Sequence, residues 1–222
     1  MPDLTPNRMD IWGIVVAAGR GVRFGARKHA TRLAGKPLWQ WARDALLESG
    51  ARGVVVVGDV PGGVEGGPER HLSVARGLEE VDAEATVIAV HDAARPLASA
   101  ALMRRMYRVL AESRADGVVP VVPIADALKR VDSDRVRILD SIDRRDVASA
   151  QTPQVFRAGV LRRAHAHHAS GGALHDDAGM VEALGGRVLA VAGERSAMKI
   201  TYPEDLVVVE ALLRHGSRPG AP

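Results

Sequence analysis

Two cations follow a run of small residues near the start of the chain, in a pattern that suits phosphate binding. An apolar run at residues 14–18 leads into Gly19 and Gly21, and Arg23 and Lys28 come shortly after. Small residues let backbone N–H groups approach a ligand closely, and fixed positive charge stabilises phosphate oxygens. We therefore predict a buried strand that ends in a polyphosphate-binding loop. At an α-phosphate under attack, such cations stabilise the transition state more than the ground state.

Two better-known phosphate loops do not fit this stretch. A Walker A loop requires Ser or Thr after its Gly-Lys pair, but Pro37 follows the pair at residues 35–36. A dinucleotide-binding loop requires a third glycine where Phe24 stands and a helix that starts at once, whereas the first helical pattern starts at Pro37. A purely structural turn is the other alternative, although it leaves the cations and glycines unexplained.

The segments that must position this loop alternate between strand and helix. Apolar runs without polar alternation predict strands buried on both faces at residues 11–17, 53–57, 85–90 and 117–122. Apolar residues at three- and four-residue spacing predict helices at residues 37–49, 69–78 and 98–113. This order predicts an α/β fold with a Rossmann-like, mostly parallel sheet flanked by helices.

The alternation breaks after residue 122, where the pattern changes to a hairpin. Residues 126–137 and 136–141 pair around Asp132-Ser133-Asp134, and a two-stranded ribbon of this kind is not stable alone in water. We therefore predict a protruding arm, about residues 125–150, that lies on the domain or on a partner subunit. The chain then returns through residues 151–156, and the remaining predicted elements are helices at residues 157–168, 176–184 and 203–213 and a strand at residues 187–191.

Composition limits the class of protein. The 222 residues suit a single domain, here residues 10–215, with flexible tails at residues 1–9 and 216–222. The net charge of +3 and the aromatic content of 3% argue against a nucleic-acid partner and favour small anionic substrates. No apolar run approaches the ~20 residues of a membrane span, residues 1–10 lack the apolar core of a secretory signal, and cysteine is absent. We expect a cytoplasmic protein with no membrane partner.

Six segments downstream of the loop carry a specific resemblance. In chain order they are Gly66-Gly67-Pro68-Glu69-Arg70-His71-Leu72-Ser73-Val74, His91-Asp92-Ala93-Ala94-Arg95-Pro96, Asp143-Arg144, Gln151-Thr152-Pro153-Gln154, Asp176-Asp177-Ala178, and Lys199-Ile200-Thr201 with Pro203-Glu204-Asp205-Leu206. The loop is similar to the nucleotidyltransferase signature A-A-G-x-G-x-R followed by a lysine. Together these motifs resemble the 2-C-methyl-D-erythritol 4-phosphate cytidylyltransferase family over residues 11–213.

The resemblance implies a reaction. Members of that family transfer a cytidylyl group from CTP to 2-C-methyl-D-erythritol 4-phosphate, which gives 4-diphosphocytidyl-2-C-methyl-D-erythritol and pyrophosphate in isoprenoid precursor biosynthesis. The resemblance also implies Mg²⁺ or another divalent cation as cofactor, CTP and an alditol phosphate as ligands, and a homodimer formed through the hairpin arm. A phosphomonoester nucleophile is largely dianionic at neutral pH, so this chemistry needs no general base.

The resemblance implies roles for individual residues as well. Catalysis would fall to Arg23, Lys28 and Lys199. CTP would contact Ala17, Ala18, Gly19, Gly21, Gly67, Ser73 and Asp92, and the acceptor would contact Arg95, Ser141, Arg157 and His175. Asp92 ends a predicted strand, where α/β sheets bind ligands, so it could orient the ribose or hold the metal ion. Because the family's arm crosses the dimer, Ser141 and Arg157 could serve the neighbour's site.

Each assignment has a structural alternative. Ser73 could bond its own helix backbone, Asp92 could cap a helix, and Arg95 could be a solvated surface arginine. Three departures from the family pattern also stand in the sequence: Arg27-Lys28-His29 replaces Pro-Lys-Gln, Pro68 has no N–H to offer the base, and His175 replaces a threonine.

Three histidines could imitate a metal site. His165, His167 and His168 lie on one predicted helix, but neighbours in sequence cannot point the same way. We interpret them as a solvated face.

Two rival functions stay open. The related ribitol-5-phosphate cytidylyltransferases share the loop and the Thr-Pro-Gln segment, although Val74 and Ala94 favour the methylerythritol enzyme. A non-catalytic nucleotide-binding regulatory subunit would be expected to lose Arg23 or Lys28, and both are present.

Overall fold

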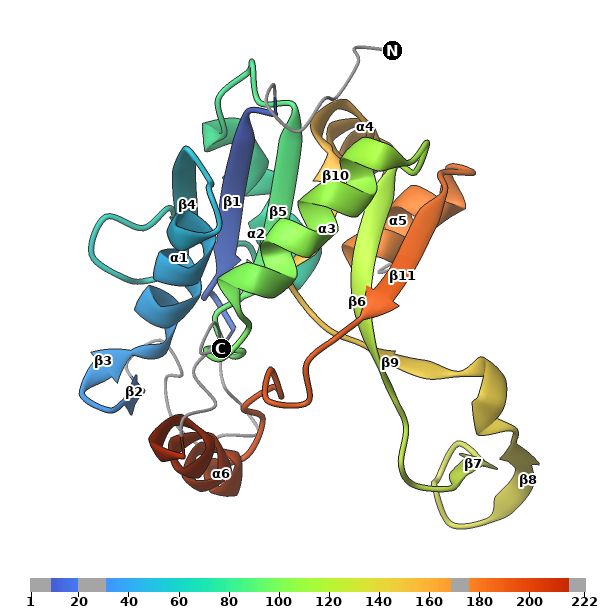
Figure 1. Cartoon of the computed structure of the whole chain (residues 1–222). Helices are drawn as coiled ribbons and strands as arrows, with labels where there is room; N and C mark the ends of the chain where they lie inside the picture. The colour runs from blue at the N-terminus through green and yellow to red at the C-terminus, as the bar shows by residue number, and fades with distance from the viewer. Residues whose placement is uncertain (1–8, 20–30, 169–175, 216–222) are drawn as a thin grey trace.

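The computed structural model describes residues 9–19, 31–168 and 176–215, and its centre is a seven-stranded sheet (Figure 1). Six strands follow in the order β11-β6-β10-β5-β1-β4, and β9 pairs with β6. The strands are β1 (Ile11–Val16), β4 (Gly53–Val57), β5 (Val87–Asp92), β6 (Gly117–Pro123), β9 (Ala148–Ala150), β10 (Gln154–Arg157) and β11 (Val188–Ala192). Because β4, β1 and β5 run parallel and β11 is parallel to β6, the predicted mostly parallel α/β sheet is confirmed.

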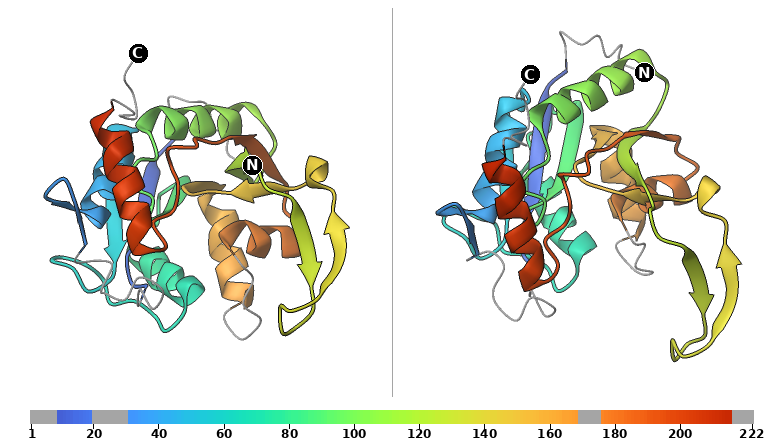
Figure 2. Two further views of the ribbon diagram at one scale, coloured as in Figure 1. Left: turned by 90° about the horizontal axis from the view of Figure 1, so that it is seen from below. Right: turned by 60° about the horizontal axis from the view of Figure 1, so that its bottom comes forward.

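Helices cover both faces of the sheet. They are α1 (Leu38–Glu48), α2 (Arg70–Glu80), α3 (Ala100–Glu112), α4 (Ala158–His168), α5 (Asp177–Ala183) and α6 (Pro203–Arg214), and among the described residues none is long and apolar enough to cross a membrane. α1 and α3 pack on one face, and α2, α4 and α5 pack on the other (Figure 1, Figure 2). On β1, Val15 enters the first core and Ile14 the second. The uninterrupted apolar runs therefore reflect strands covered on both faces.

Strand β10 runs against the central strands beside it. It pairs antiparallel with both β5 and β6. The chain leaves the sheet at the carboxyl end of β6, makes the arm, and re-enters at that end without a crossover helix, so β10 must run in the opposite direction. As a result, Gln154 lies at the carboxyl edge of the parallel strands, whereas Arg157 lies at their amino edge.

The predicted arm protrudes from the body as a hairpin (Figure 1). The elements outside the main sheet are β2 (Arg32–Leu33), β3 (Lys36–Pro37), β7 (Leu128–Val131), β8 (Ile138–Ile142) and a 3-10 helix (Arg144–Asp146). β7 and β8 pair antiparallel, and in their turn the Asp132 carboxylate accepts from the backbone N–H groups of Val136 and Arg137. Val136 is 86% exposed and Ile138 is 60% exposed. The hairpin is confirmed, and its use in dimerisation stays a prediction.

Helix α6 lies near the carboxyl edge of the parallel strands (Figure 2). Pro203 begins the helix, where its missing N–H costs nothing. Val209 on the inner face packs in a small third core with Leu38 and Ile200. This packing holds the segment before α6, and with it Lys199, beside the end of β5.

Candidate active site

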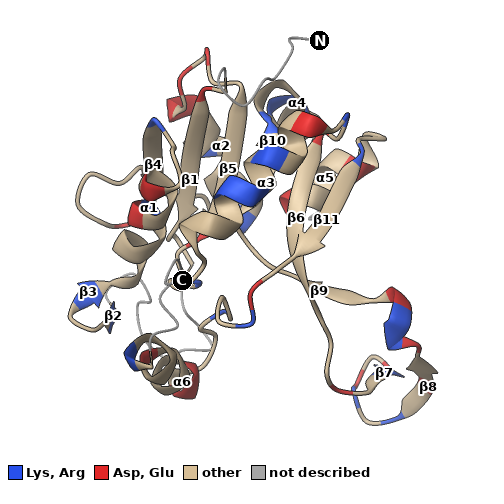
Figure 3. Cartoon of the chain, in the orientation of Figure 1, with Lys and Arg blue, Asp and Glu red and all other residues tan. Residues whose placement is uncertain are grey.

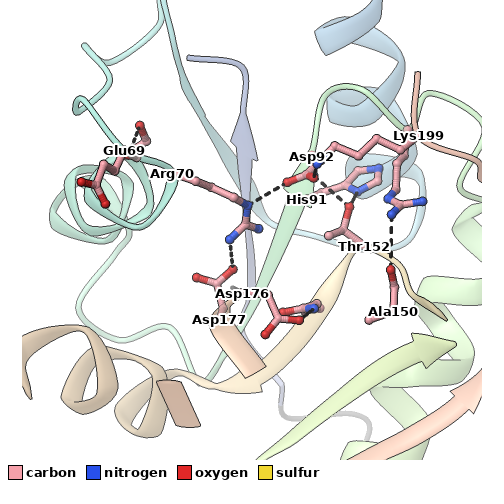
Figure 4. Close-up of polar contacts among 12 residues, drawn as sticks. Glu69, Arg70, His91, Asp92, Ala150, Thr152, Asp176, Asp177 and Lys199 are labelled. Atoms are coloured by element: carbon pink, nitrogen blue, oxygen red, sulfur yellow. Dashed lines mark hydrogen bonds and ion pairs between the residues drawn. The ribbon is translucent and has the colours of Figure 1, made fainter. Parts of the chain in front are cut away.

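Asp92 is the centre of a charged cluster at the carboxyl end of β5 (Figure 4). Its Oδ1 accepts from Arg70 Nε at 3.1 Å, and its Oδ2 accepts from Lys199 Nζ at 2.6 Å. Its backbone N–H donates to Thr152 Oγ1 at 3.0 Å. Three segments far apart in the sequence therefore converge on Asp92, two on its carboxylate and one on its backbone N–H. Asp92 does not cap α3, because Ser99 caps that helix.

Charge keeps Asp92 ionised although its surroundings are dry. Burial raises the pKa of the Asp92 carboxyl, but the positive charges of Arg70 and Lys199 outweigh this effect and hold it far below its usual range. Burial also acts on Arg70, where it lowers the pKa of the guanidinium. The negative charges of Asp177 and Asp92 together outweigh burial and raise that pKa above its usual range. Asp92 and Arg70 therefore both stay charged near neutral pH.

Arg70 connects Asp92 to a second buried carboxylate. Its Nη1 donates to Asp177 Oδ2 at 2.7 Å, and Asp177 Oδ1 lies 2.9 Å from His165 Nε2. His165 is buried, so its predicted place on a solvated face is wrong, whereas His167 is exposed as predicted. The reason is helical spacing: Leu161 and His165 are four residues apart on the face of α4 that packs on the sheet.

His91 precedes Asp92 on β5, and its neutral side chain contacts the same threonine as the Asp92 backbone. His91 Nδ1 lies 3.0 Å from Thr152 Oγ1. Burial lowers the pKa of His91 to about 3, with a smaller contribution from the charge of Arg95, so its imidazole is neutral in the folded protein. His91 and Asp92 thus share Thr152, which ties β5 to the segment that precedes β10.

The residues assigned to the base pocket also come together. Ser73 Oγ accepts from the Gly67 backbone N–H at 3.1 Å and donates to the Glu69 carbonyl at 3.1 Å. A Cβ on Gly66 would lie 2.2 Å from the Ala18 Cβ, so only glycine fits there. The first turn of α2 therefore packs tightly against the end of the β1 segment. The structural alternative for Ser73, a bond to its own helix backbone, is present alongside the contact to Gly67.

Arg95 is partly buried rather than solvated. Its Nη1 donates to the Ala197 carbonyl at 2.9 Å, and its Nη2 donates to the Ala150 carbonyl at 3.3 Å. Burial lowers the pKa of its guanidinium, and Asp92 acts in the opposite direction. Arg95 therefore borders the Asp92 cluster and links it to the root of the arm, which excludes a freely solvated surface arginine.

Two acceptor candidates lie away from this cluster. Ser141 is on the arm, where its Oγ accepts from Lys129 Nζ at 2.6 Å. Arg157 pairs with Val87 at the start of β5, roughly 17 Å along the strand from Asp92. Its guanidinium donates to the carbonyls of Leu110, Ser113 and Ala115 at the end of α3. The structure thus does not bring Arg157 to the cluster of its own chain, because β10 is antiparallel.

Several predicted residues lie outside the described residues. These are Gly21, Arg23, Lys28 and His175, together with the unusual neighbours of Lys28. Gly19 is described, and it is exposed at the point where the β1 segment ends.

Sequence reasoning assigned no role to four residues of the cluster: Arg70, His91, Thr152 and Asp177. All four lie inside motifs that the sequence analysis quoted for the resemblance. His91 in particular continues a wholly buried strand. That a polar side chain must have a partner once it is buried is a usable signal, but the identity of the partner depends on the fold.

Comparison with known proteins gives a consistent result. The model of the family described as 2-C-methyl-D-erythritol 4-phosphate cytidylyltransferase (IspD) matches residues 11–215. The chain is 41% identical to such an enzyme of Rhodococcus opacus (strain B4), over 96% of this chain and 100% of that protein. A relative of the same name from Rubrobacter xylanophilus is 37% identical over 92% of this chain and 97% of its own. The crystal structure of the Thermus thermophilus enzyme superposes with a TM-score of 0.76, at 34% identity, over 90% of this chain and 98% of that one.

Proposed function

The chain belongs to the 2-C-methyl-D-erythritol 4-phosphate cytidylyltransferase family, and from this premise we propose how its residues divide the work. The enzyme transfers a cytidylyl group from CTP to 2-C-methyl-D-erythritol 4-phosphate in isoprenoid precursor biosynthesis. This function is favoured over a ribitol-5-phosphate cytidylyltransferase and over a non-catalytic subunit. One observation carries the division of work: Asp92 is held between Arg70 and Lys199 (Figure 4).

The cytosine of CTP binds where α2 begins. Ala17, Ala18, Gly67 and Ser73 line this pocket, and the close packing of Ala18 against Gly66 keeps it narrow. A narrow pocket with backbone N–H groups and one hydroxyl suits a pyrimidine better than a purine. Gly19 and Gly21 offer their backbones to the triphosphate.

Catalysis requires positive charge around the α-phosphate. An oxygen of the acceptor phosphate forms a new bond to the α-phosphorus, and the bond from that phosphorus to pyrophosphate breaks. Arg23, Lys28 and Lys199 stabilise the charge that gathers on the phosphate oxygens. Figure 3 shows Lys and Arg positions interspersed with Asp and Glu positions along the described chain, so we assign the attraction of the anions to these local cations.

The divalent cation expected with CTP fits Asp92. A carboxylate has lone pairs beyond those that Arg70 and Lys199 use, and Mg²⁺ at nucleotide sites takes one or two carboxylates and completes its shell with phosphates and water. Among the described residues no group of three or more His, Asp or Glu could hold a metal ion, so Asp92 would be the protein's ligand and phosphate oxygens and water would complete the shell. An ion held there would offset negative charge on the phosphates.

The acceptor binds between the cluster and the arm of a second copy. Arg95 and His175 contact it from one subunit, and Ser141 contacts it from the neighbour. The exposed apolar side chains of the arm, with Ile138 60% exposed, support a homodimer. We assign Arg157 to holding the end of α3, because its guanidinium already donates to three carbonyls.

The use of CTP as a substrate supports a cytoplasmic location for the enzyme.

Pyrophosphate release from CTP tests the proposal. We expect release with 2-C-methyl-D-erythritol 4-phosphate and little with ribitol 5-phosphate, and a turnover lower by ~10²–10³ in Lys28→Ala and in Lys199→Ala. The matched control is Lys36→Ala, which removes a lysine that pairs with Asp44 and lies outside the proposed catalytic and binding set. Binding of CTP without release in the presence of either acceptor would mean that the chain is a regulatory subunit.

A further inference from the structure

One buried carboxylate divides its two oxygens between partners on different helices. Asp177 begins α5 and is fully buried. Its Oδ2 accepts from Arg70 Nη1 at 2.7 Å, and its Oδ1 lies 2.9 Å from His165 Nε2. Arg70 also donates from Nε to Asp92 Oδ1 (Figure 4). His165 on α4 is therefore connected to the active-site carboxylate through Asp177 and Arg70.

The observed contact between Arg70 and Asp177 is not the strongest that these groups can form. An arginine and a carboxylate pair best through two parallel hydrogen bonds. Arg70 Nη2 is buried and has no hydrogen-bond partner among the described residues, so the guanidinium has a donor to spare. A second bond from Nη2 to Asp177 would satisfy that donor. In the observed orientation Oδ1 is bonded to His165 and makes no bond to Nη2, so the carboxylate would have to turn to present both oxygens to Arg70, and that turn would break the bond to His165.

Such a second bond would act against the active site. The guanidinium would have to turn so that both terminal nitrogens face Asp177, and Nε would then move away from Asp92. Asp92 would lose one of the two cations that orient it, and only Lys199 would be left. The single bond to Asp177 is therefore the arrangement that leaves Arg70 available to Asp92.

We propose that His165 is a positioning residue for the transfer reaction: by occupying Oδ1 of Asp177, it prevents Asp177 from capturing Arg70 and so preserves the contact between Arg70 and Asp92. His165 does not touch the substrates. The surrounding packing fits this role, because Leu161 and Ala164 of α4 are fully buried and Met180 of α5 nearly so, which fixes the two helices against each other. The proposal rests on the proposed role of Asp92 in CTP and metal binding.

Substitutions at His165 separate positioning from packing. His165→Gln keeps an N–H donor near the position of Nε2, His165→Asn carries a donor that is too short to reach, and His165→Leu keeps the volume without a donor. His167→Leu on the exposed side of the same helix is the matched control. If the leucine variant does not fold, the Gln and Asn variants alone make the comparison, since both are polar.

The kinetic result expected follows from the distance to the substrates. We expect kcat about tenfold lower in His165→Leu and in His165→Asn, with the KM for CTP changed less than about twofold, because a supporting residue changes the alignment of Asp92 more than ground-state binding. His165→Gln should recover kcat to within about threefold, and His167→Leu should equal the wild type. Equal losses in the Gln and Asn variants, or no loss in either, would overturn the proposal.

A second measurement needs no substrate. The Arg70 Nε–H resonance in a ¹H–¹⁵N spectrum, assigned by its loss in Arg70→Lys, should shift in His165→Asn and return to its wild-type position in His165→Gln. A resonance that does not move in His165→Asn overturns the proposal. If the resonance moves but kcat is unchanged, His165 positions Arg70 without affecting turnover, and the proposal is overturned. If Asp92→Asn is fully active in the same assay, the role proposed for Asp92 is wrong, and the failure does not come from His165 alone.

Discussion

The Asp92 cluster and the hairpin arm both contain arginine–carboxylate pairs, but those of the cluster are more deeply buried, with Arg70 itself 28% exposed. In the cluster, Arg70 contacts Asp92 and Asp177, whose side chains are 10% and 0% exposed. In the arm, Arg130 contacts Asp140 at 3.2 Å, and these side chains are 62% and 55% exposed. The same chemical pair thus occurs in opposite surroundings within one chain.

Burial decides what such a pair contributes. Water screens an exposed pair, which stabilises a fold by about 1 kcal/mol at most. A buried charge that loses its partner destabilises the fold by ~3–5 kcal/mol, because it can no longer be solvated. The cluster is therefore a rigid and preorganised region. Residues 124–147 of the arm include no buried residue, and we predict that the arm gains stability from contact with another surface.

Removal of the arginine from each pair should give the largest difference. Arg70→Met leaves Asp177 buried beside His165 alone, and we expect the free energy of unfolding to fall by ~3–5 kcal/mol. Arg130→Met should change it by less than about 1 kcal/mol. Urea denaturation measures both variants. Similar losses in the two would show that burial does not distinguish the pairs.

Removal of the carboxylate charge should separate the regions in catalysis. Asp92→Asn keeps the shape of the side chain but removes the charge that Arg70 and Lys199 hold in place, so we expect a turnover lower by ~10². Asp140→Asn on the arm should have wild-type turnover. Pyrophosphate release measures both, and normal turnover in Asp92→Asn would remove Asp92 from the site.

Acid should weaken the cluster more than it weakens the arm. Burial raises the pKa of Asp177, but the charge of Arg70 and the bond to His165 outweigh it and hold that pKa below its usual range. A carboxyl with a lowered folded-state pKa stabilises the fold above its unfolded pKa of about 3.9, and this stability is lost as the pH falls through that value toward the folded pKa. The unfolding free energy should therefore fall from about pH 5 to pH 3 in the wild type, and less steeply in Asp177→Asn.

Asp140→Asn is the control for this pH series, and its curve should run parallel to that of the wild type. If Asp177→Asn also runs parallel, the acid sensitivity comes from other groups, among which Asp92 and His91 also have lowered pKa values.

The sequence predicts the scaffold well because its signals are local. Four apolar runs and the helices between them identified the parallel part of the sheet, and Asp132-Ser133-Asp134 identified the turn of the arm. The direction of β10 could not be predicted, because residues 151–156 read equally well in either direction. Only the re-entry of the chain at the carboxyl edge fixes it.

The sequence predicted which residues belong to the candidate site better than it predicted which of them contact one another. Motifs pointed to Asp92 and Lys199, and the fold then brought them within 2.6 Å. The contact of His165 with Asp177 was missed because adjacent histidines suggested a solvated face, although the spacing from Leu161 already placed His165 inside. Partners that lie on different helices are set by packing, which no single stretch of sequence encodes.

Substitution of the exposed apolar side chains of the arm should have the smallest effect on the stability of the fold. It should instead have a large effect on dimer formation. The double substitution Val136→Ser with Ile138→Ser removes two exposed apolar side chains, so the unfolding free energy of a monomer should change by less than about 0.5 kcal/mol per site. If these two side chains pack against a second copy of the chain, light scattering on diluted samples should show that the variant is a monomer and the wild type a dimer. Val207→Ser, at a 65% exposed position on α6, is the matched control and should leave the dimer intact. Dissociation by Val207→Ser but not by the arm variant would place the interface on α6, and the arm would then have to be stable without a partner.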